Sequence, residues 1–272
     1  MLKTRIITAC ILVAGFIPAL FMLSNVYWAY GMLVLTLLAL NEWACMIQLS
    51  TMQRTVYLVI AAIAGLTIVQ LMQQQGFHPF FYYSLNVFFM VSLFWVLIVP
   101  CWLAKKWVLS KYVMALLGLL LMASIWLALI CAKSADPWLL LALLTTIWIA
   151  DSAAYFAGKK FGKHKLTPSI SPGKTWEGVL GAMIAVTLFG AILFFKFKVT
   201  TLAIFPALWL IAGLGVIGDL FESMLKRQAG IKDSGNLLPG HGGILDRIDG
   251  IIPSLPIAIL IIYAYNLWWS PA

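Results

Sequence analysis

The organisation of this chain is decided by GDLFESMLKRQAGIKDSGNLLPGHGGILDRIDG, residues 218–250, which lies between two long apolar runs. Five of the nine acidic residues of a 63% hydrophobic chain fall within it: Asp219, Glu222, Asp233, Asp246 and Asp249. Four of the eighteen Lys and Arg residues are also there: Lys226, Arg227, Lys232 and Arg247. Because so apolar a chain gathers its charge here, we interpret the segment as a site acting on charged molecules. The alternative is a solvated connector between membrane spans, but such connectors tend to be short.

The first part of this segment predicts the end of a helix. Four polar residues recur at i, i+3, i+4 and i+7 and so share one face: Asp219, Glu222, Ser223 and Lys226. The second part is rich in glycine, which lets the backbone approach a ligand closely. Asp246 and Asp249 are three residues apart, so a single turn can direct both carboxylates the same way. Mg²⁺ is usually held by one or two carboxylates together with substrate phosphates, and the neighbouring basic residues suit phosphate oxygens.

Composition predicts an all-α, polytopic integral membrane protein. Mean hydropathy is +1.01, only 10% of the residues are charged, and a spanning helix needs about 20 mostly apolar residues. About nine transmembrane helices are expected, over residues 6–24, 27–47, 56–73, 85–104, 112–132, 137–157, 178–195, 201–220 and 251–269.

The distribution of Lys and Arg predicts a cytoplasmic N-terminus. With that orientation, fifteen of the eighteen basic residues fall on the inner side, as the positive-inside rule expects. The three on the outer side are Lys133, Lys196 and Lys198. The net charge of +9 is therefore no sign of nucleic-acid binding. It indicates a basic cytoplasmic rim, suited to anionic lipid heads and nucleotide phosphates. We expect the chain to lie in a bacterial-type inner membrane, with its site facing the cytoplasm.

We expect two regions. Residues 1–135 would be a scaffold of transmembrane helices, with a homodimer interface as a further role, and residues 136–272 would be the catalytic region. The first region has one acidic residue, Glu42, inside its second expected span. An acid in a membrane span is a functional candidate, and a structural carboxyl hydrogen-bonded to a neighbour is an equal alternative.

Two further polar residues precede the main segment. Asp151 lies in the sixth expected span and should meet a partner or a cation, or else form a buried hydrogen bond between helices. Lys174 lies in a Gly-Lys-Thr triplet within a basic loop. A phosphate-binding P-loop needs glycine where this chain has Pro168, and a preceding strand, which we do not expect, so we reject that motif. Lys174 is still a candidate for holding phosphate, a solvated lysine being the alternative, and Thr175 could cap the following helix.

These residues resemble the phosphatidate cytidylyltransferases, or CDP-diacylglycerol synthases. The family signature is matched without departure across the main segment, by Ser223, Lys226-Arg227, Lys232-Asp233, Gly235, Leu238-Pro239, His241-Gly242-Gly243 and Asp246-Arg247-Ile248-Asp249. Two shorter family elements are matched at residues 151–155 and 171–178. The detailed resemblance covers residues 145–250, and the first half resembles the family only in being a set of spans.

The resemblance implies that CTP and phosphatidate react to give CDP-diacylglycerol and pyrophosphate. It implies Mg²⁺ bound by Asp219 and Asp246, with Asp249 next, and a second cation such as K⁺ that Asp249 or Ser223 would help to bind. Catalytic roles then fall to Asp219, Lys226, Asp246 and Asp249. Substrate contacts fall to Asp151, Lys174, Ser223, Arg227, Lys232, His241 and Arg247.

Three other functions are weighed against this one. A CDP-alcohol phosphotransferase is suggested by Asp246-x-x-Asp249-Gly250, but its motif continues with Ala-Arg and further acids that residues 251–253 lack. A CTP-dependent lipid kinase would use the same kinds of residue. A transporter would carry acids along a pathway through the spans, whereas here they gather at one membrane face.

Overall fold

The computed structural model describes residues 2–196, 201–237, 239–240 and 242–269, and most of them are helical. Its helices, in chain order, are α1 (Leu2–Met22), α2 (Asn25–Met46), α3 (Thr51–Gln75), α4 (Phe77–Leu93), the π-helix η1 (Phe94–Ile98), α5 (Val99–Lys105), α6 (Lys111–Ala135), α7 (Pro137–Phe161), α8 (Trp176–Lys196), α9 (Ile204–Gln228), α10 (Leu245–Ile248) and α11 (Ile251–Trp269). Its two strands are β1 (Lys165–Thr167) and β2 (Ser171–Thr175).

The predicted class, an all-α polytopic membrane protein, is confirmed. Within the described residues, eight helical segments are long and apolar enough to cross a membrane. The first of the nine expected spans, residues 6–24, corresponds to a shorter apolar helix, Ile7–Met22. Each remaining expected span has a helical segment of its own, and η1 continues α4 into α5 so that they form one span.

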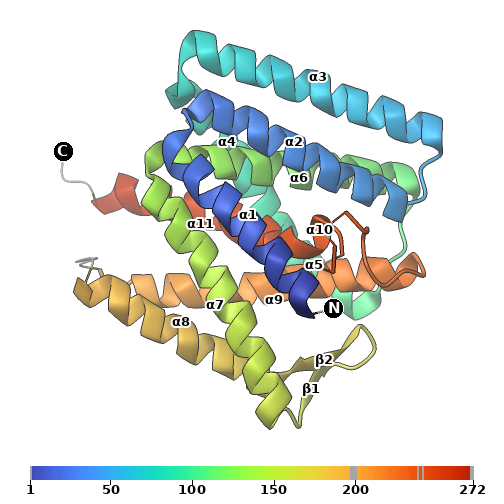
Figure 1. Ribbon diagram of the computed structural model, residues 1–272, viewed down its shortest axis with the longest axis vertical. Coiled ribbons are helices and arrows are strands. Elements are labelled where there is room, and N and C mark those ends of the chain that lie inside the picture. The colour runs from blue at the N-terminus through green and yellow to red at the C-terminus, as the bar shows by residue number, and fades with distance from the viewer. Residues whose placement is uncertain (1, 197–200, 238, 241, 270–272) are drawn as a thin grey trace.

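The helices form a bundle with α11 near its centre (Figure 1). In that view α3 lies along one edge against α2, while α8 and α9 lie along the opposite side. α11 contacts α9, α6 and α4, so it joins the two halves of the chain. The apolar core is continuous across residue 135, with Leu40 and Trp126 in the same cluster as Leu144 and Leu255. The predicted division into scaffold and catalytic regions stays a prediction.

A two-stranded hairpin stands where the sequence predicted an irregular basic loop. β1 and β2 are antiparallel, with Lys165 paired to Thr175 and Thr167 paired to Ser171. The expectation that no strand precedes Gly-Lys-Thr is therefore wrong, because this triplet ends β2. Strands of three and five residues carry no apolar alternation long enough to be detected. The P-loop stays excluded by Pro168.

The hairpin leads directly into α8, and small residues hold α8 against α7. The Thr175 hydroxyl accepts a hydrogen bond from Gly178 N at 3.1 Å, which confirms the predicted cap. A methyl group added at Gly178 would lie 2.9 Å from Ala154 O, and one at Gly181 would lie 2.4 Å from Ala157 Cβ. The close approach of these two helices fixes α7 relative to the hairpin.

An aromatic cluster supports α9 on the side away from its polar face. The ring of Phe221 lies 5.9 Å from Phe94, 5.4 Å from Trp95 and 5.3 Å from Trp102, each in an edge-on arrangement. Such pairs add to the stabilisation from burial alone. They lock the turn of α9 that precedes Glu222.

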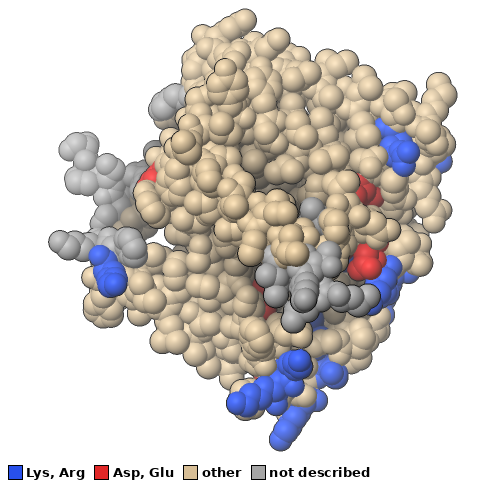
Figure 2. Space-filling view, viewed as in Figure 1, with Lys and Arg blue, Asp and Glu red and all other residues tan. Residues whose placement is uncertain are grey.

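Basic side chains gather at one end of the molecule. On the face shown in Figure 2, Lys and Arg cluster at the end that carries the hairpin. Hydrogen bonds join the loops at this end: Lys106 Nζ donates to Ser169 Oγ at 2.9 Å, and Gln228 Nε2 donates to Trp107 O at 3.1 Å. We call this the basic end. At the opposite end, Lys133 Nζ donates to Leu23 O and Asn25 Oδ1.

Candidate active site

The predicted polar face of α9 exists and lies at the basic end. Ser223 Oγ donates to Asp219 Oδ1 at 3.1 Å, one turn away. Lys226 Nζ binds Glu222 Oε2 at 3.0 Å, also one turn away. These i,i+4 contacts follow directly from helix geometry, so this half of the site was predictable from spacing alone.

Lys226 also joins α9 to α10. Its ammonium nitrogen lies 2.5 Å from Asp246 Oδ1, so it sits between two carboxylates. The three side chains are only 11%, 5% and 6% exposed for Lys226, Glu222 and Asp246. A buried ion triad of this kind is costly to break, since removing one partner leaves an uncompensated charge. The structure therefore fixes the position of the Lys226 cation closely.

Asp246 is occupied on both of its oxygens. Oδ1 binds Lys226, while Oδ2 accepts hydrogen bonds from Ser234 N at 3.0 Å and Gly243 N at 2.9 Å. A carboxylate with this many donors has little capacity left for a metal ion unless one of them moves. Its predicted role as a metal ligand stays a prediction.

Asp219 is bound from a different direction by the hairpin. Lys174 Nζ lies 2.7 Å from Asp219 Oδ2 and also donates to Val216 O at 3.3 Å. Asp219 is 40% exposed and Lys174 is 21% exposed, so this pair lines the open side of the site. Of the two alternatives for Lys174, a plain solvated lysine is wrong.

Asp249 is brought to Asp219 by a close contact of backbones. A methyl group at Gly218 would lie 2.2 Å from Asp249 O and 2.8 Å from Pro253 Cγ, so only glycine lets α9 approach the start of α11. Asp249 then lies within electrostatic reach of both Asp219 and Glu222. Its own Oδ1 accepts a hydrogen bond from Gly250 N at 2.8 Å.

Asp151 and Arg247 complete the charged groups. Asp151, an exposed residue of α7, interacts electrostatically with Asp219, Lys174 and Arg247. The sequence-predicted acid in the sixth span thus faces the same site as the acids of α9. We call the eight charged residues now described the charged site: Asp151, Asp219, Glu222, Asp246, Asp249, Lys174, Lys226 and Arg247.

Of the other predicted substrate-binding residues, Ser223 contacts Asp219, as described above, whereas Arg227 and Lys232 are not brought to the charged site. Arg227 is exposed, and its Nη1 donates to Ile231 O at 3.4 Å, within the turn that follows α9. Lys232 is exposed on the loop that joins α9 to α10. His241 lies outside the described residues.

The chemistry of the charged site suits a divalent cation. Among the described residues, no three His, Cys, Asp or Glu side chains form a ready-made metal cluster. Magnesium does not require one, because one or two carboxylates and substrate phosphates usually suffice. Glu222 Oε1 is buried and has no basic or amide donor among the described residues, and the Glu222 side chain meets the carboxyl group of Asp249. Two adjacent carboxyl groups of this kind fit a divalent cation, which takes oxygen ligands.

Sequence reasoning left two alternatives open for Glu42 and did not identify its partner. This buried residue of α2 accepts hydrogen bonds from Ser234 Oγ at 3.0 Å, Ile244 N at 3.0 Å and Leu245 N at 2.8 Å. Of the two alternatives left open, the hydrogen-bonded carboxyl is the one observed. Its partner is the loop of the charged site, far away in the sequence.

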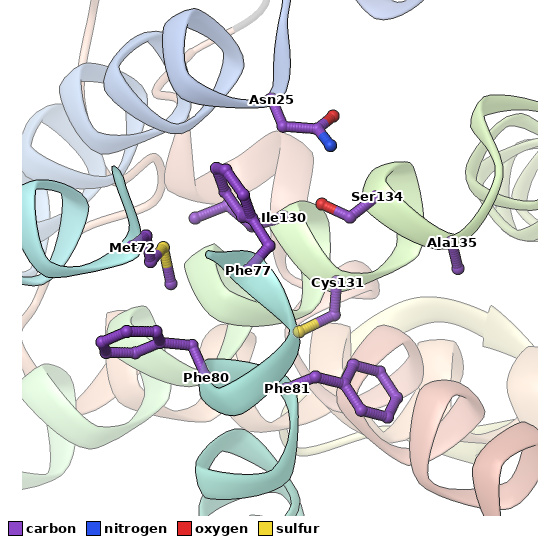
Figure 3. A pocket seen from close by; sticks show the side chains of 9 residues that line it. All are labelled: Asn25, Met72, Phe77, Phe80, Phe81, Ile130, Cys131, Ser134 and Ala135. Atoms are coloured by element: carbon purple, nitrogen blue, oxygen red, sulfur yellow. The ribbon is translucent and has the colours of Figure 1, made fainter. Parts of the chain in front are cut away.

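A separate cavity lies at the opposite end from the charged site. It has a volume of about 310 Å³ and is bordered by Asn25, Met72, Phe77, Phe80, Phe81, Ile130, Cys131, Ser134 and Ala135. Aromatic rings and short side chains from several helices face it (Figure 3). None of the predicted site residues borders it, so it is not the place where the charged site acts.

The chain is similar to known proteins along most or all of its length. The model of the cytidylyltransferase family matches residues 3–265. The chain is similar to the phosphatidate cytidylyltransferase of Pseudomonas aeruginosa, with 34% identity over 285 residues and full coverage of both chains. It is similar to that of Haemophilus influenzae, with 34% identity over 94% of this chain and 96% of that protein. It also resembles that of Thermotoga maritima, with 40% identity over 44% of this chain and 47% of that protein.

Proposed function

The chain belongs to the cytidylyltransferase family, and on that premise we propose that it transfers the cytidylyl group of CTP to phosphatidate. The products are CDP-diacylglycerol and pyrophosphate, and the activity belongs to phospholipid biosynthesis. Relatives that match 100% and 94% of the chain carry the name of this activity. The residues that perform it are proposed below from the geometry of the charged site.

The observation that carries this proposal is the charge balance of the site. Five carboxylates face three cations, namely Lys174, Lys226 and Arg247. When all five acids are ionised, their excess of negative charge would repel a triphosphate and a lipid phosphate unless a further cation were bound. A divalent ion would resolve the conflict, because such ions take both carboxylate and phosphate oxygens as ligands. The site is therefore suited to two anionic substrates and a metal.

We assign the metal, with Mg²⁺ as the proposed ion, to Asp219 and Asp249. Asp219 is partly exposed, and both acids lie close enough to influence each other electrostatically. Asp246 would join them only by releasing one of its three donors. The chemistry supplied by the bound ion is neutralisation of charge on the triphosphate and the departing pyrophosphate. A second cation such as K⁺, near Asp249 or Ser223, stays a prediction.

The chain's own cations hold and orient the phosphates. Lys226 is held by two carboxylates, and its proposed partner is the α-phosphate. Lys174 and Arg247 reach the site from the hairpin and from α10, and suit the outer phosphates or the lipid phosphate. Arg227 and Lys232, which are exposed, remain proposed substrate contacts at the rim, and His241 remains one on the strength of the sequence alone.

The reaction needs no general base. A phosphatidate phosphate is already an anion near neutral pH, so one of its oxygens can attack the α-phosphorus of CTP directly. The new bond joins an oxygen of the lipid phosphate to the α-phosphorus of CTP. The bond between the α-phosphorus and the oxygen that bridges it to the β-phosphorus breaks, and this oxygen leaves with pyrophosphate. Catalysis then rests on orientation and charge neutralisation, as in phosphoryl transfer generally.

We further propose that the charged site faces the cytoplasm of a bacterial-type inner membrane. The clustering of Lys and Arg at the basic end supports this orientation. CTP would then arrive from the cytoplasm and phosphatidate from the membrane. A homodimer formed through residues 1–135 is a further part of the proposal.

The experiment that tests the activity uses purified protein with CTP labelled at either the α- or the γ-phosphate. Transfer to phosphatidate would place the α-label in the lipid and the γ-label in pyrophosphate. A lipid kinase would place the γ-label in the lipid and release CDP. A CDP-alcohol phosphotransferase would leave CTP unused and release CMP from CDP-diacylglycerol. Absence of α-label from the lipid would overturn the proposal.

A further inference from the structure

One carboxylate of α2, that of Glu42, accepts hydrogen bonds from the loop that joins α9 to α10, residues 229–244, and from the first residue of α10. Glu42 Oε2 accepts from Ser234 Oγ and Leu245 N, and Oε1 accepts from Ile244 N. Glu42 is only 6% exposed. Three donors from two separate points of the chain thus converge on a single buried acid.

The loop is shaped around this carboxylate. A methyl group at Gly235 would lie 2.5 Å from Glu42 Oε1, and one at Gly243 would lie 2.3 Å from Glu42 Oε2. Both distances are below what real side chains show, so any residue other than glycine would displace the loop or Glu42. These two glycines let the backbone close on Glu42, where the sequence suggested close approach to a ligand.

The same stretch of backbone is held from its other side by Asp246. Ser234 donates through its nitrogen to Asp246 and through its hydroxyl to Glu42. Gly243 N donates to Asp246, and the next two nitrogens along the chain donate to Glu42. Because Asp246 in turn binds Lys226, the position of the Lys226 cation depends on a loop that Glu42 holds.

The contact requires an acceptor at both oxygens. Each oxygen of Glu42 receives at least one N–H, and no ion pair joins Glu42 to a Lys or Arg among the described residues. Replacement by glutamine keeps the shape but turns an NH₂ group towards an N–H donor. A buried donor left without an acceptor is costly, so the loop would shift.

We propose that Glu42 is a positioning residue of the cytidylyl transfer, acting through the α9–α10 loop and Asp246 to place Lys226. The assignment rests on the proposed function, but the contact itself does not. It predicts that the loss of Glu42 lowers turnover in each folded molecule rather than only the amount of folded protein.

The test compares Glu42→Gln, Glu42→Ala and Ser234→Ala in the full-length purified protein. Ser234→Ala removes one donor to Glu42 and is the mildest change. The control is Asp136→Ala at the opposite end, where Asp136 Oδ1 accepts from Trp138 N at 2.9 Å and caps α7. That control also removes a carboxylate that accepts a backbone N–H, at an exposed helix cap far from the loop, so it reports the effect of losing such a bond elsewhere in the fold.

Two readouts are taken for each variant. Hydrogen exchange followed by mass spectrometry reports the amides of residues 229–250 without any substrate. Turnover is measured as kcat per folded molecule, with KM for phosphatidate recorded alongside. Both Glu42 variants should exchange faster in this segment. Their kcat should fall by roughly tenfold or more, because a misplaced Lys226 would orient the reacting phosphates poorly even when the substrates are bound. Glu42→Gln combined with Ser234→Ala should be less than additive, since both act on one contact.

The outcomes separate the two proposals. Unchanged exchange in residues 229–250, or unchanged kcat in both Glu42 variants, would overturn the role of Glu42. So would an equal fall of kcat in Asp136→Ala, because the effect would then be general destabilisation. If the unsubstituted protein makes no CDP-diacylglycerol, the proposed function fails, while faster exchange in the variants would still establish the contact.

Discussion

Lys174 Nζ lies 2.7 Å from Asp219 Oδ2, so a residue of the hairpin neutralises the acid proposed as the first metal ligand. The two residues come from β2 and α9, and Lys174 also reaches the backbone of α9 at Val216 O. An ammonium group therefore occupies the side of Asp219 that faces the open part of the site. Lys174 must share this carboxylate with any divalent ion that binds there.

Replacing Lys174 by glutamine should strengthen metal binding and weaken CTP binding. Removal of a positive charge beside Asp219 favours a second cation, and roughly fivefold tighter Mn²⁺ binding is expected for this partly solvated pair. The KM for CTP should rise, because a phosphate contact is lost. Mn²⁺ binding is measured without substrate by electron paramagnetic resonance.

The matched control for this variant is Lys106→Gln. Lys106 also binds the hairpin, through Ser169 Oγ, but it does not contact Asp219. Its Mn²⁺ affinity should equal that of the unsubstituted protein. Equal Mn²⁺ affinity in Lys174→Gln and Lys106→Gln would contradict competition between Lys174 and the metal.

Asp219→Asn should reduce kcat by roughly a hundredfold to a thousandfold, the usual effect of losing one group that stabilises transition-state charge. Asparagine keeps the size of the side chain and can still accept from Ser223 Oγ, so the fold should persist. Turnover is measured over a range of Mg²⁺ concentrations. Activity equal to that of the Asp136→Asn control at every Mg²⁺ concentration, low as well as high, would remove Asp219 from the metal site.

Lys226→Ala should be both inactive and destabilised. Glu222 and Asp246 are 5% and 6% exposed, and without Lys226 they would face each other as buried like charges. The loss of one partner from such a group costs about 3 kcal/mol, measurable as a lower melting temperature. Lys160→Ala, which alters an exposed lysine of α7, should melt like the unsubstituted protein.

A double variant separates the two effects of Lys226. Adding Glu222→Gln to Lys226→Ala removes one of the two opposed acids, so part of the lost melting temperature should return. Turnover should not return, because the cation is still missing. Recovery of activity together with stability would mean that Lys226 is needed only for folding.

The sequence predicted the parts of the site that depend on local spacing. The contacts of Ser223 with Asp219 and of Lys226 with Glu222 follow from positions four residues apart on one helix. The spans were also predictable, because each needs only a long apolar run. In both cases the information lies within a few turns of the chain.

Contacts between distant segments were beyond the reach of that reasoning. Two contacts depend on how the α9–α10 loop folds back: the ion pair of Lys226 with Asp246, and the hydrogen bond from Leu245 N to Glu42. Composition marked Glu42 as an unusual acid in a membrane span, but it gave no partner. Gly235 and Gly243 were the available signal, since glycines in such a loop indicate close approach to some atom.

Gly218→Ala offers the sharpest test of how α9 meets the start of α11. The added methyl group would lie 2.2 Å from Asp249 O and 2.8 Å from Pro253 Cγ. A backbone carbonyl and a proline ring cannot move aside without a large cost in free energy. We expect α9 to move away, separating Asp219 from Asp249, so that both Mn²⁺ affinity and turnover fall by roughly tenfold or more. Overpacking of this kind also costs about 1–3 kcal/mol of stability.

The control lies on the same helix. An alanine at Gly213 would meet no atom within 4 Å, so Gly213→Ala should leave turnover and Mn²⁺ affinity unchanged. Its melting temperature should stay the same or rise slightly, because alanine favours a helix over glycine by up to about 1 kcal/mol. If Gly218→Ala behaved like Gly213→Ala in Mn²⁺ binding and in turnover, the spacing of Asp219 and Asp249 would not depend on this contact. The metal would then have to be assigned to other acids of the charged site.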